Sequence, residues 1–277
     1  MNIILLGILT LNLHTWQESH AREKLDRVAD YIALENLDFV TLQEVGQHQE
    51  GVATDYPFAP FQPEGDELFP DDLEYPEDPG NSALYLVQRL KEVHGLDYSL
   101  IWTWAHMGFG VFQEGSAILS RYPLVDGGRA FVSSEENRYD VSTRRILWAE
   151  VDHPVHGLMR LVSVHVGWGN QQVPQIQKAL DVLSNLKPLP TLMAGDFNME
   201  PSAPGYALIK SLGWVDQALG AKERGRGLAT MGNRRIDYVW ASAEWTLPPQ
   251  KSLVQFSQRQ KGADAPVSDH AGVVIRY

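Results

Sequence analysis

Residues 191–201, Thr-Leu-Met-Ala-Gly-Asp-Phe-Asn-Met-Glu-Pro, form the stretch around which the rest of the chain is organised. The run begins as an apolar strand and then presents an acid and an amide, Asp196 and Asn198. Side chains two residues apart on an extended chain share a face, so this pair points one way and Phe197 the other. Such a pair can bind a metal-bound water and a phosphoryl oxygen. The same residue types also favour an ordinary turn at a strand end, and this stretch alone leaves both interpretations open.

The composition limits the kind of metal site that the chain can build. With 277 residues, of which 44% are hydrophobic and 21% charged, the chain can bury a large core. It has no cysteine, which excludes disulfides and thiolate metal sites. Any metal must therefore bind oxygen or imidazole ligands, which favour Mg²⁺, Mn²⁺ or Ca²⁺. The net charge of −12 argues against broad adhesion to nucleic acid, although it leaves room for a local cationic groove.

The apolar start of the chain fits a buried strand better than a signal peptide. Residues 1–10 are apolar, but they lack a basic n-region and a small-residue cleavage site. No later stretch reaches the roughly 18 apolar residues that a membrane-spanning helix needs. We therefore expect a cytoplasmic protein without stable membrane association.

The spacing of apolar residues predicts strands that alternate with helices. Besides the stretch at 191–201, strands are expected at residues 3–13, 38–43, 98–104, 114–121, 145–151, 158–165, 235–241, 251–256 and 271–277. Helices are expected at residues 19–36, with Ser19 as N-cap, and at 81–93, 171–186 and 203–212. This order predicts an α/β fold with active groups at one sheet edge. Without an internal repeat or a linker, one domain over residues 1–277 is expected, with two β-rich halves and helices outside.

One segment departs from this pattern. Residues 51–80 are rich in Pro, Gly and acids, and no Lys or Arg occurs between Arg27 and Arg89. We interpret residues 51–80 as an acidic loop excursion beside Glu44. This excursion is either a solvated loop or a lid over the site.

Polar residues recur at or near the ends of the predicted apolar strands. One such residue alone is commonly a cap or a structural histidine, but nine oxygen and imidazole groups together predict a functional site. The nine are Asn12, Glu44, Glu114, His165, Asp196, Asn198, Asp237, Asp269 and His270.

These residues lie in motifs that resemble the endonuclease/exonuclease/phosphatase superfamily. The motifs span Asn12 to His270 in the family's order, and they include the runs at residues 42–45, 114–121, 163–165, 195–198, 235–238 and 268–270. The resemblance implies a four-layer α/β sandwich, in which two mixed β-sheets pack face to face with helices outside. It also implies hydrolysis of a phosphate ester.

The resemblance implies a role for each of the nine residues. Glu44 would be the main Mg²⁺ ligand, with Asn12 and Asp269 supporting the site and Mn²⁺ as an alternative ion. Asp196 would orient and deprotonate the attacking water, and Asn198 would hold the phosphate. Two histidines would face the phosphate, each held by a carboxylate: His270 by Asp237 and His165 by Glu114.

The chemistry of phosphate-ester hydrolysis needs such a set. The uncatalysed reaction is very slow, so the barrier must be lowered greatly. A hard cation neutralises phosphate charge, a carboxylate accepts the proton of water, and an imidazole fixed by a carboxylate stabilises developing negative charge. Arg144 or Arg145 is a candidate phosphate contact, and the alternative is a solvated pair at a strand end.

The substrate is less determined than the reaction. A small phosphate ester is favoured by the acidity of the chain, and a nuclease acting on DNA or RNA is the main alternative. A sphingomyelinase-like lipid phosphodiesterase and a catalytically silent binding module are two more. A basic loop and several aromatic residues are candidate substrate contacts, with a solvated loop and core packing as their alternatives: Lys222, Arg224, Arg226, Arg234 and Arg235, and Trp102, Trp104, Phe109, Phe112 and Trp168.

Overall fold

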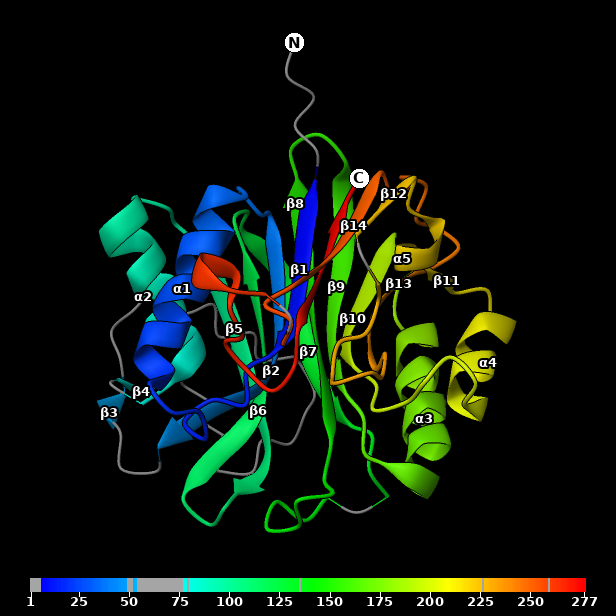
Figure 1. Ribbon diagram of the computed structural model, residues 1–277. Helices are drawn as coiled ribbons and strands as arrows, with labels where there is room; N and C mark the ends of the chain where they lie inside the picture. Colours follow the sequence, from blue (N-terminus) through cyan, green and yellow to red (C-terminus); the bar gives the residue numbers. More distant parts are fainter. Residues whose placement is uncertain are drawn as a thin grey trace.

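A computed structural model shows two β-sheets packed face to face, with α1 and α2 outside one sheet and α3 and α4 outside the other (Figure 1). This arrangement confirms the predicted four-layer sandwich. The structure describes residues 6–48, 52–53, 77–78, 80–134, 136–225, 227–258 and 260–277. Most of the acidic excursion at 51–80 lies outside these ranges; within it, β3 (Val52–Ala53) pairs with β4 (Glu77–Asp78).

The first sheet has seven strands in the order β12-β14-β15-β1-β2-β6-β5 within the described residues. Its central strands are mixed in direction, because β1 runs parallel to β2 and antiparallel to β15. The strands are β1 (Gly7–Asn12), β2 (Phe39–His48), β5 (Ser99–Gly108), β6 (Phe112–Ser120), β12 (Glu223–Arg224), β14 (Lys251–Gln255) and β15 (Gly272–Arg276).

The second sheet has six strands in the order β11-β13-β10-β9-β8-β7, again counted over the described ranges. Here β10 runs parallel to β9 and antiparallel to β13. The strands are β7 (Leu124–Phe131), β8 (Arg145–His153), β9 (Gly157–His165), β10 (Thr191–Asp196), β11 (Val215–Asp216) and β13 (Asp237–Ala241). The sequence pattern did not predict β7, which contains two consecutive glycines.

The four predicted helices are present, each within two residues of its expected ends. They are α1 (Ala21–Leu34), α2 (Ser82–His94), α3 (Gln172–Ser184) and α4 (Pro204–Ser211), and the short α5 (Gln217–Gly220), η1 (Gly169–Gln171) and η2 (Gly262–Asp264) accompany them. The predicted N-cap Ser19 is wrong. The chain enters α1 through His20, which is left-handed with φ 57° and makes no side-chain cap bond.

Three apolar layers hold the sandwich together. Ile8, Phe39 and Leu192 belong to the layer between the sheets. Leu9 on the other face of β1 belongs to the layer under α1 and α2, and a third layer lies under α3 and α4. Because both faces of the central strands are covered, these strands read as nearly continuous apolar runs. A buried bond from Gln43 Nε2 to Ser163 Oγ, 3.0 Å long, links the two sheets.

Two strands continue at least four residues beyond their predicted ends. β2 was expected to end before Glu44, but it continues to His48 after an irregularity between Leu42 and Val45. β5 was expected to end at Trp104, and it reaches Gly108 after a similar irregularity. Such bulges let a strand bend and continue its pairing, so a local break in alternation does not mark the strand's end.

None of the described helices is long and apolar enough to cross a lipid bilayer. The cytoplasmic location stays a prediction.

Candidate active site

Strand pairing brings residues that are far apart in sequence to one edge of the sandwich. Asp196, the last residue of β10, lies opposite His165 on parallel β9 and opposite Asp237 on antiparallel β13. On the facing sheet β1 ends at Asn12, beside Gln43 of β2. In Figure 1, β1 runs downward and ends near the middle height of the molecule, above the β5–β6 and β7–β8 connections.

The local geometry of residues 195–198 explains the sequence Gly-Asp-Phe-Asn. Gly195 has φ 154°, and a Cβ there would lie 1.9 Å from the carbonyl oxygen of Val164, so only glycine fits. Asp196 Oδ1 accepts a 2.8 Å hydrogen bond from the backbone N–H of Asn198, and Asn198 Nδ2 donates to the carbonyl of Val166 at 2.9 Å. The chain therefore turns back at this point and holds both side chains at the strand end.

The second carboxylate oxygen of Asp196 lies at the centre of the site. Asn12 Nδ2 donates to Asp196 Oδ2 at 3.2 Å and to Glu44 Oε1 at 2.7 Å. The Nε2 atoms of His165 and His270 each lie 3.7 Å from the same Asp196 oxygen. One buried oxygen thus faces an amide and two imidazoles contributed by three separate segments of the chain.

Electrostatics disfavour the ionised form of this carboxyl group. Burial and the charge of nearby Asp237 raise the pKa of Asp196 to about 8. Burial and the charge of Glu114 likewise raise the pKa of Glu44, although the bond from Asn12 opposes the shift. Buried carboxylates that crowd one another in this way favour protonation or a cation between them.

The predicted pairing of Asp237 with His270 is confirmed. His270 Nδ1 lies 3.0 and 3.2 Å from the two carboxylate oxygens of Asp237. Burial alone would lower the pKa of His270, but the charge of Asp237 and this hydrogen bond raise it to about 10. His270 is therefore a cation at neutral pH, with Nε2 turned toward Asp196.

The predicted pairing of His165 with Glu114 is wrong. Glu114 Oε1 lies 3.1 Å from Nε2 of His106, on the neighbouring strand β5. His165 Nε2 instead faces Asp196 and Glu44, and lies 3.5 Å from Asn198 Nδ2. The reason is register: the irregularity in β5 places His106 directly beside Glu114.

The surroundings also give the two site histidines different charges. Burial, together with the positive charges of Arg144 and His106, holds the pKa of His165 well below its usual range. His165 is therefore neutral at the pH where His270 is protonated.

The structure distinguishes the two adjacent arginines. Arg144 is buried, its Nη1 donates to the carbonyls of Val141 and Thr143, and its charge acts on Glu44, Glu114 and Asp196. Arg145, the first residue of β8, has different contacts. Its Nη1 donates to Thr103 Oγ1, and its guanidinium lies 3.9 Å from the ring centre of Phe131. Arg144 therefore faces the site, and Arg145 packs in the fold.

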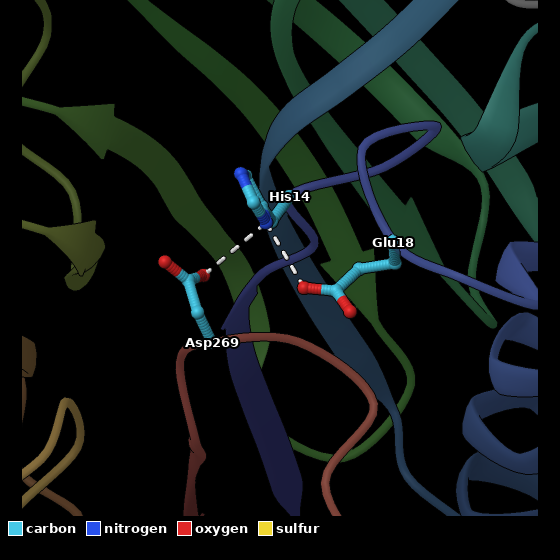
Figure 2. A group of neighbouring side chains, drawn as sticks. All are labelled: His14, Glu18 and Asp269. Atoms are coloured by element: carbon cyan, nitrogen blue, oxygen red, sulfur yellow. Dashed lines mark hydrogen bonds and ion pairs between the residues drawn. The ribbon is translucent and has the colours of Figure 1, made fainter.

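Asp269 belongs to a separate group with His14 and Glu18 (Figure 2). His14 Nδ1 lies 2.9 Å from Glu18 Oε1 and 3.7 Å from Asp269 Oδ1. The backbone N–H of His14 donates to Asn12 Oδ1 at 3.1 Å, so this residue touches two of the three predicted metal ligands. Asp269 is the more exposed partner, with 42% of its side chain accessible.

Three groups of described residues could hold a metal ion: Glu44 with His165 and Asp196, Asp196 with Asp237 and His270, and His14 with Glu18 and Asp269. The carboxylates of the first group suit a hard divalent cation, whose charge would offset their crowding. Asn12 turns its amide nitrogen toward Glu44 and Asp196, so it could offer an oxygen there only after the amide rotates. The three predicted ligands Asn12, Glu44 and Asp269 thus do not form one ready group.

Some predicted substrate contacts have other partners. In the basic loop, Arg235 Nη2 donates to Asp216 Oδ1 at 2.7 Å in a buried ion pair, and Arg234 pairs with Glu200. Arg226 lies outside the described residues. Among the aromatic candidates, Trp102 is buried in the core.

Sequence reasoning missed His106 and His14. The signal for His106 was the apolar alternation that continues past Trp104 to Gly108, which a shorter strand assignment discarded. His14 lies two residues after Asn12, but its ring contacts Asp269, which is more than 250 positions away in the chain. Such a contact has no local signature.

Known structures share this fold over nearly the whole chain. An endonuclease/exonuclease/phosphatase family protein from Leptotrichia buccalis superposes with TM-score 0.80 and 25% identity, covering 98% of each chain. A mannosyl-6-phosphatase from Bacteroides thetaiotaomicron gives TM-score 0.64 at 17% identity, covering 98% of each chain. Truncated TDP2 from Caenorhabditis elegans gives 0.60 at 15%, covering 99% of this chain and 97% of that one.

Similarity in sequence identifies the family. No curated protein is similar enough to count as a match. Residues 14–270, however, match the Endonuclease/Exonuclease/phosphatase family, and that match includes Glu44, His165, Asp196 and His270. The chain therefore belongs to the endonuclease/exonuclease/phosphatase family, an enzyme family that hydrolyses phosphate esters.

Proposed function

We propose that this protein is a Mg²⁺-dependent phosphoesterase that hydrolyses a small phosphodiester or phosphomonoester. Glu44 would be the main metal ligand, with Asn12 and Asp269 supporting it, and Mn²⁺ could replace Mg²⁺. The bound cation would supply positive charge to the phosphate oxygens and the leaving oxygen. The carboxylate crowding around Asp196 supports this assignment, because a cation would relieve it.

The chain's own residues would divide the remaining work. Asp196 would orient the attacking water and accept its proton, while the water oxygen bonds to phosphorus and the ester P–O bond breaks. Asn198 would hold a phosphoryl oxygen through its amide. His270, positioned by Asp237, would meet the developing negative charge as a cation.

His165 and Glu114 would act differently from each other. His165 is neutral and buried against Asp196, so it would donate or accept a hydrogen bond at the phosphate rather than provide a charge. Glu114, held against His106, would orient Arg144 through charge.

The observation that carries the proposal is the surroundings of one oxygen, Asp196 Oδ2. An amide, a neutral imidazole and a cationic imidazole lie 3.2 to 3.7 Å from it. A structural ion pair needs one partner, and several partners at a crowded, buried carboxylate are typical of an acid–base site. The small substrate is favoured by the net charge of −12 and by the ion pairs that bind Arg234 and Arg235.

A panel of phosphate esters tests the proposal. With Mg²⁺ present, we expect hydrolysis of bis-p-nitrophenyl phosphate and of a small phosphate monoester or diester, and loss of that activity with a chelator. Plasmid DNA, RNA, abasic DNA, inositol phosphates and sphingomyelin complete the panel. A preference for nucleic acid that declines steeply with salt would indicate the nuclease alternative, because backbone binding releases counterions. The absence of any metal-dependent hydrolysis would contradict the assignment.

The two arginines give a matched prediction. Arg144→Met should lower kcat/KM for the preferred ester by about 100-fold, because it removes a charged contact to the phosphate. Arg145→Met should leave kcat/KM within about threefold but lower the melting temperature, because its cation–π and hydrogen-bond contacts lie inside the fold. Steady-state kinetics and thermal unfolding of both variants provide the measurement. Equal effects on kcat/KM would refute the distinction.

A further inference from the structure

The large aromatic side chains that are exposed in the described part of the chain all lie on one edge. They are Phe109, Tyr139 and Trp168, which are 71%, 85% and 67% accessible. Phe109 lies at the tip between β5 and β6, Tyr139 between β7 and β8, and Trp168 between β9 and α3. These three connections lie in the lower part of the molecule in Figure 1, below the end of β1. We call these three residues the aromatic rim.

Hydrogen bonds fix the loop between β7 and β8 to β5 and to α3. The backbone N–H of Met107 at the end of β5 donates to the carbonyl of Arg138 at 2.6 Å. On the other side of the same loop, Lys178 Nζ of α3 donates to the carbonyl of Ser133 at 3.1 Å. The loop that carries Tyr139 is therefore fixed between β5, which precedes Phe109, and α3, which follows Trp168.

The aromatic rim is also continuous with the phosphate-binding side of the site. Trp168 follows His165 by three residues, and Phe109 follows His106 by three. The loop of Tyr139 leads into Arg144, whose Nη1 donates to the carbonyl of Val141 at 2.5 Å. Each aromatic residue is thus attached to a segment that supplies a charged or imidazole group to the site.

Exposed aromatic rings in this arrangement need an explanation. Single exposed apolar residues are ordinary, but a group confined to one functional edge marks a binding surface. Val111 and Val141 on two of these loops and Val173 in the first turn of α3 are exposed as well. A planar ring can stack on exposed aromatic side chains whatever its hydrogen-bonding pattern.

We propose that the aromatic rim binds a planar ring carried by the substrate, so that the preferred substrate is a ring-bearing phosphate ester such as a nucleoside phosphodiester. This inference rests on the proposed phosphoesterase activity and adds the substrate class. The occupant is part of a small ester because the surface adjoins the phosphate site and because the chain's net charge of −12 disfavours a long polyanion. In this arrangement the phosphate lies among Arg144, Asn198 and His270 while the ring contacts the aromatic rim.

Two chromogenic diesters with the same leaving group test the proposal. Thymidine 5′-(p-nitrophenyl phosphate) and methyl p-nitrophenyl phosphate share the ring of the p-nitrophenyl leaving group, and only the first has a nucleoside, so a difference between them reports the nucleoside. We expect wild type to prefer the thymidine ester by at least about tenfold in kcat/KM, the size of one lost stacking contact. A triple variant that combines Phe109→Ser, Tyr139→Ser and Trp168→Ser should lose this preference. Its KM for the thymidine ester should rise, while kcat/KM for the methyl ester should change little.

A matched control separates the rim from general surface effects. Leu34, the last residue of α1, is 83% accessible. It precedes the first residue of β2, whereas Glu44 lies in the second half of that strand. Leu34→Ser should leave the preference unchanged. Equal losses for both esters in the triple variant would indicate structural damage and overturn the proposal, as would a wild-type enzyme that does not distinguish the esters. A triple variant that only changes the oligomeric state in solution would assign the rim to contact between copies and also overturn it.

A binding measurement keeps the test independent of turnover. With Mg²⁺ present, thymidine monophosphate should bind wild type at least about tenfold more tightly than inorganic phosphate, and the triple variant should lose this difference. If wild type hydrolyses neither diester yet shows this binding difference, the phosphoesterase proposal is at fault and the ring site stands. If hydrolysis is normal and the binding difference is absent, the ring site is wrong and the phosphoesterase proposal stands.

Discussion

Replacing Asp196 with asparagine should lower kcat by at least about a thousandfold, within the range that one positioned acid–base group contributes. The amide keeps the shape of the side chain and can still accept the bond from the N–H of Asn198. It cannot accept a proton from water or balance the charge of His270, whose Nε2 lies 3.7 Å away. Steady-state kinetics with saturating Mg²⁺ and the best ester of the panel would measure the loss.

The same change should not destabilise the metal-free protein. The pKa of Asp196 is about 8 in the fold against an ordinary 3.8, so the folded state disfavours the ionised form. The protonated Asp196 therefore stabilises the fold at low pH, and this stabilisation is lost as the pH rises from about 4 to 8. Asparagine does not titrate, so the variant has no such loss. Urea unfolding at about pH 5 and about pH 8, with a chelator present, should show a smaller pH dependence for Asp196→Asn than for wild type.

A surface carboxylate provides the control for both measurements. Asp181 lies exposed on α3, where it accepts a hydrogen bond from Gln177. Asp181→Asn should leave kcat and the pH dependence of unfolding unchanged. If Asp196→Asn retained more than about a tenth of the wild-type kcat, Asp196 would not be the residue that accepts the proton of water.

The fold was predictable because its signals are local. The apolar runs of β1 and β10 and the spacing in α1 and α3 are properties of short segments, and the structure contains all four. Bulges and caps were less predictable, because they depend on how a segment meets its neighbours. Glu44 lies within the break in strand pairing between Leu42 and Val45 and has φ 48°, which a pattern of alternating residues cannot reveal.

The candidate site was predictable as a list of residues but less so as a set of pairs. Asp237 and His270 were paired correctly, and their segments meet at Thr230, whose carbonyl accepts from the N–H of Ala271 and whose Oγ1 accepts from the N–H of Asp237. The pairing of Glu114 depended on the register of β5 against β6, and that register shifts between Trp104 and His106. A shift of one residue moves side chains to the other face of a strand, so sequence order alone cannot fix such a contact.

Backbone strain supports a functional interpretation of two site residues. Glu44 and Asn198 have φ values of 48° and 49°, a region that side-chain-bearing residues rarely adopt. Each left-handed residue of this kind costs on the order of 1 kcal/mol, and such positions concentrate at functional sites. In both cases glycine would relieve the strain but would remove the carboxylate or amide that the site contains.

Glu44→Gln should weaken Mg²⁺ binding by at least about tenfold, because a neutral amide replaces the carboxylate proposed as main ligand. The amide has the same size, and Asn12 Nδ2, which donates to Glu44 Oε1 at 2.7 Å, would still find an oxygen acceptor. Calorimetric titration of the metal-free protein with Mg²⁺ measures the affinity directly. In kinetic assays the Mg²⁺ concentration for half-maximal activity should rise by a similar factor.

A second carboxylate at the same edge tests whether this effect is specific. Glu114 raises the pKa of Glu44 through its charge, but it contacts His106 and belongs to none of the metal-binding groups found among the described residues. Glu114→Gln should therefore change Mg²⁺ affinity by less than about threefold, the small effect of one more distant charge. An unchanged titration in Glu44→Gln, or equal weakening in both variants, would refute the proposed ligand. Because Glu44 is held in a strained conformation that positions its carboxylate beside Asn12 and Asp196, the larger effect is expected there.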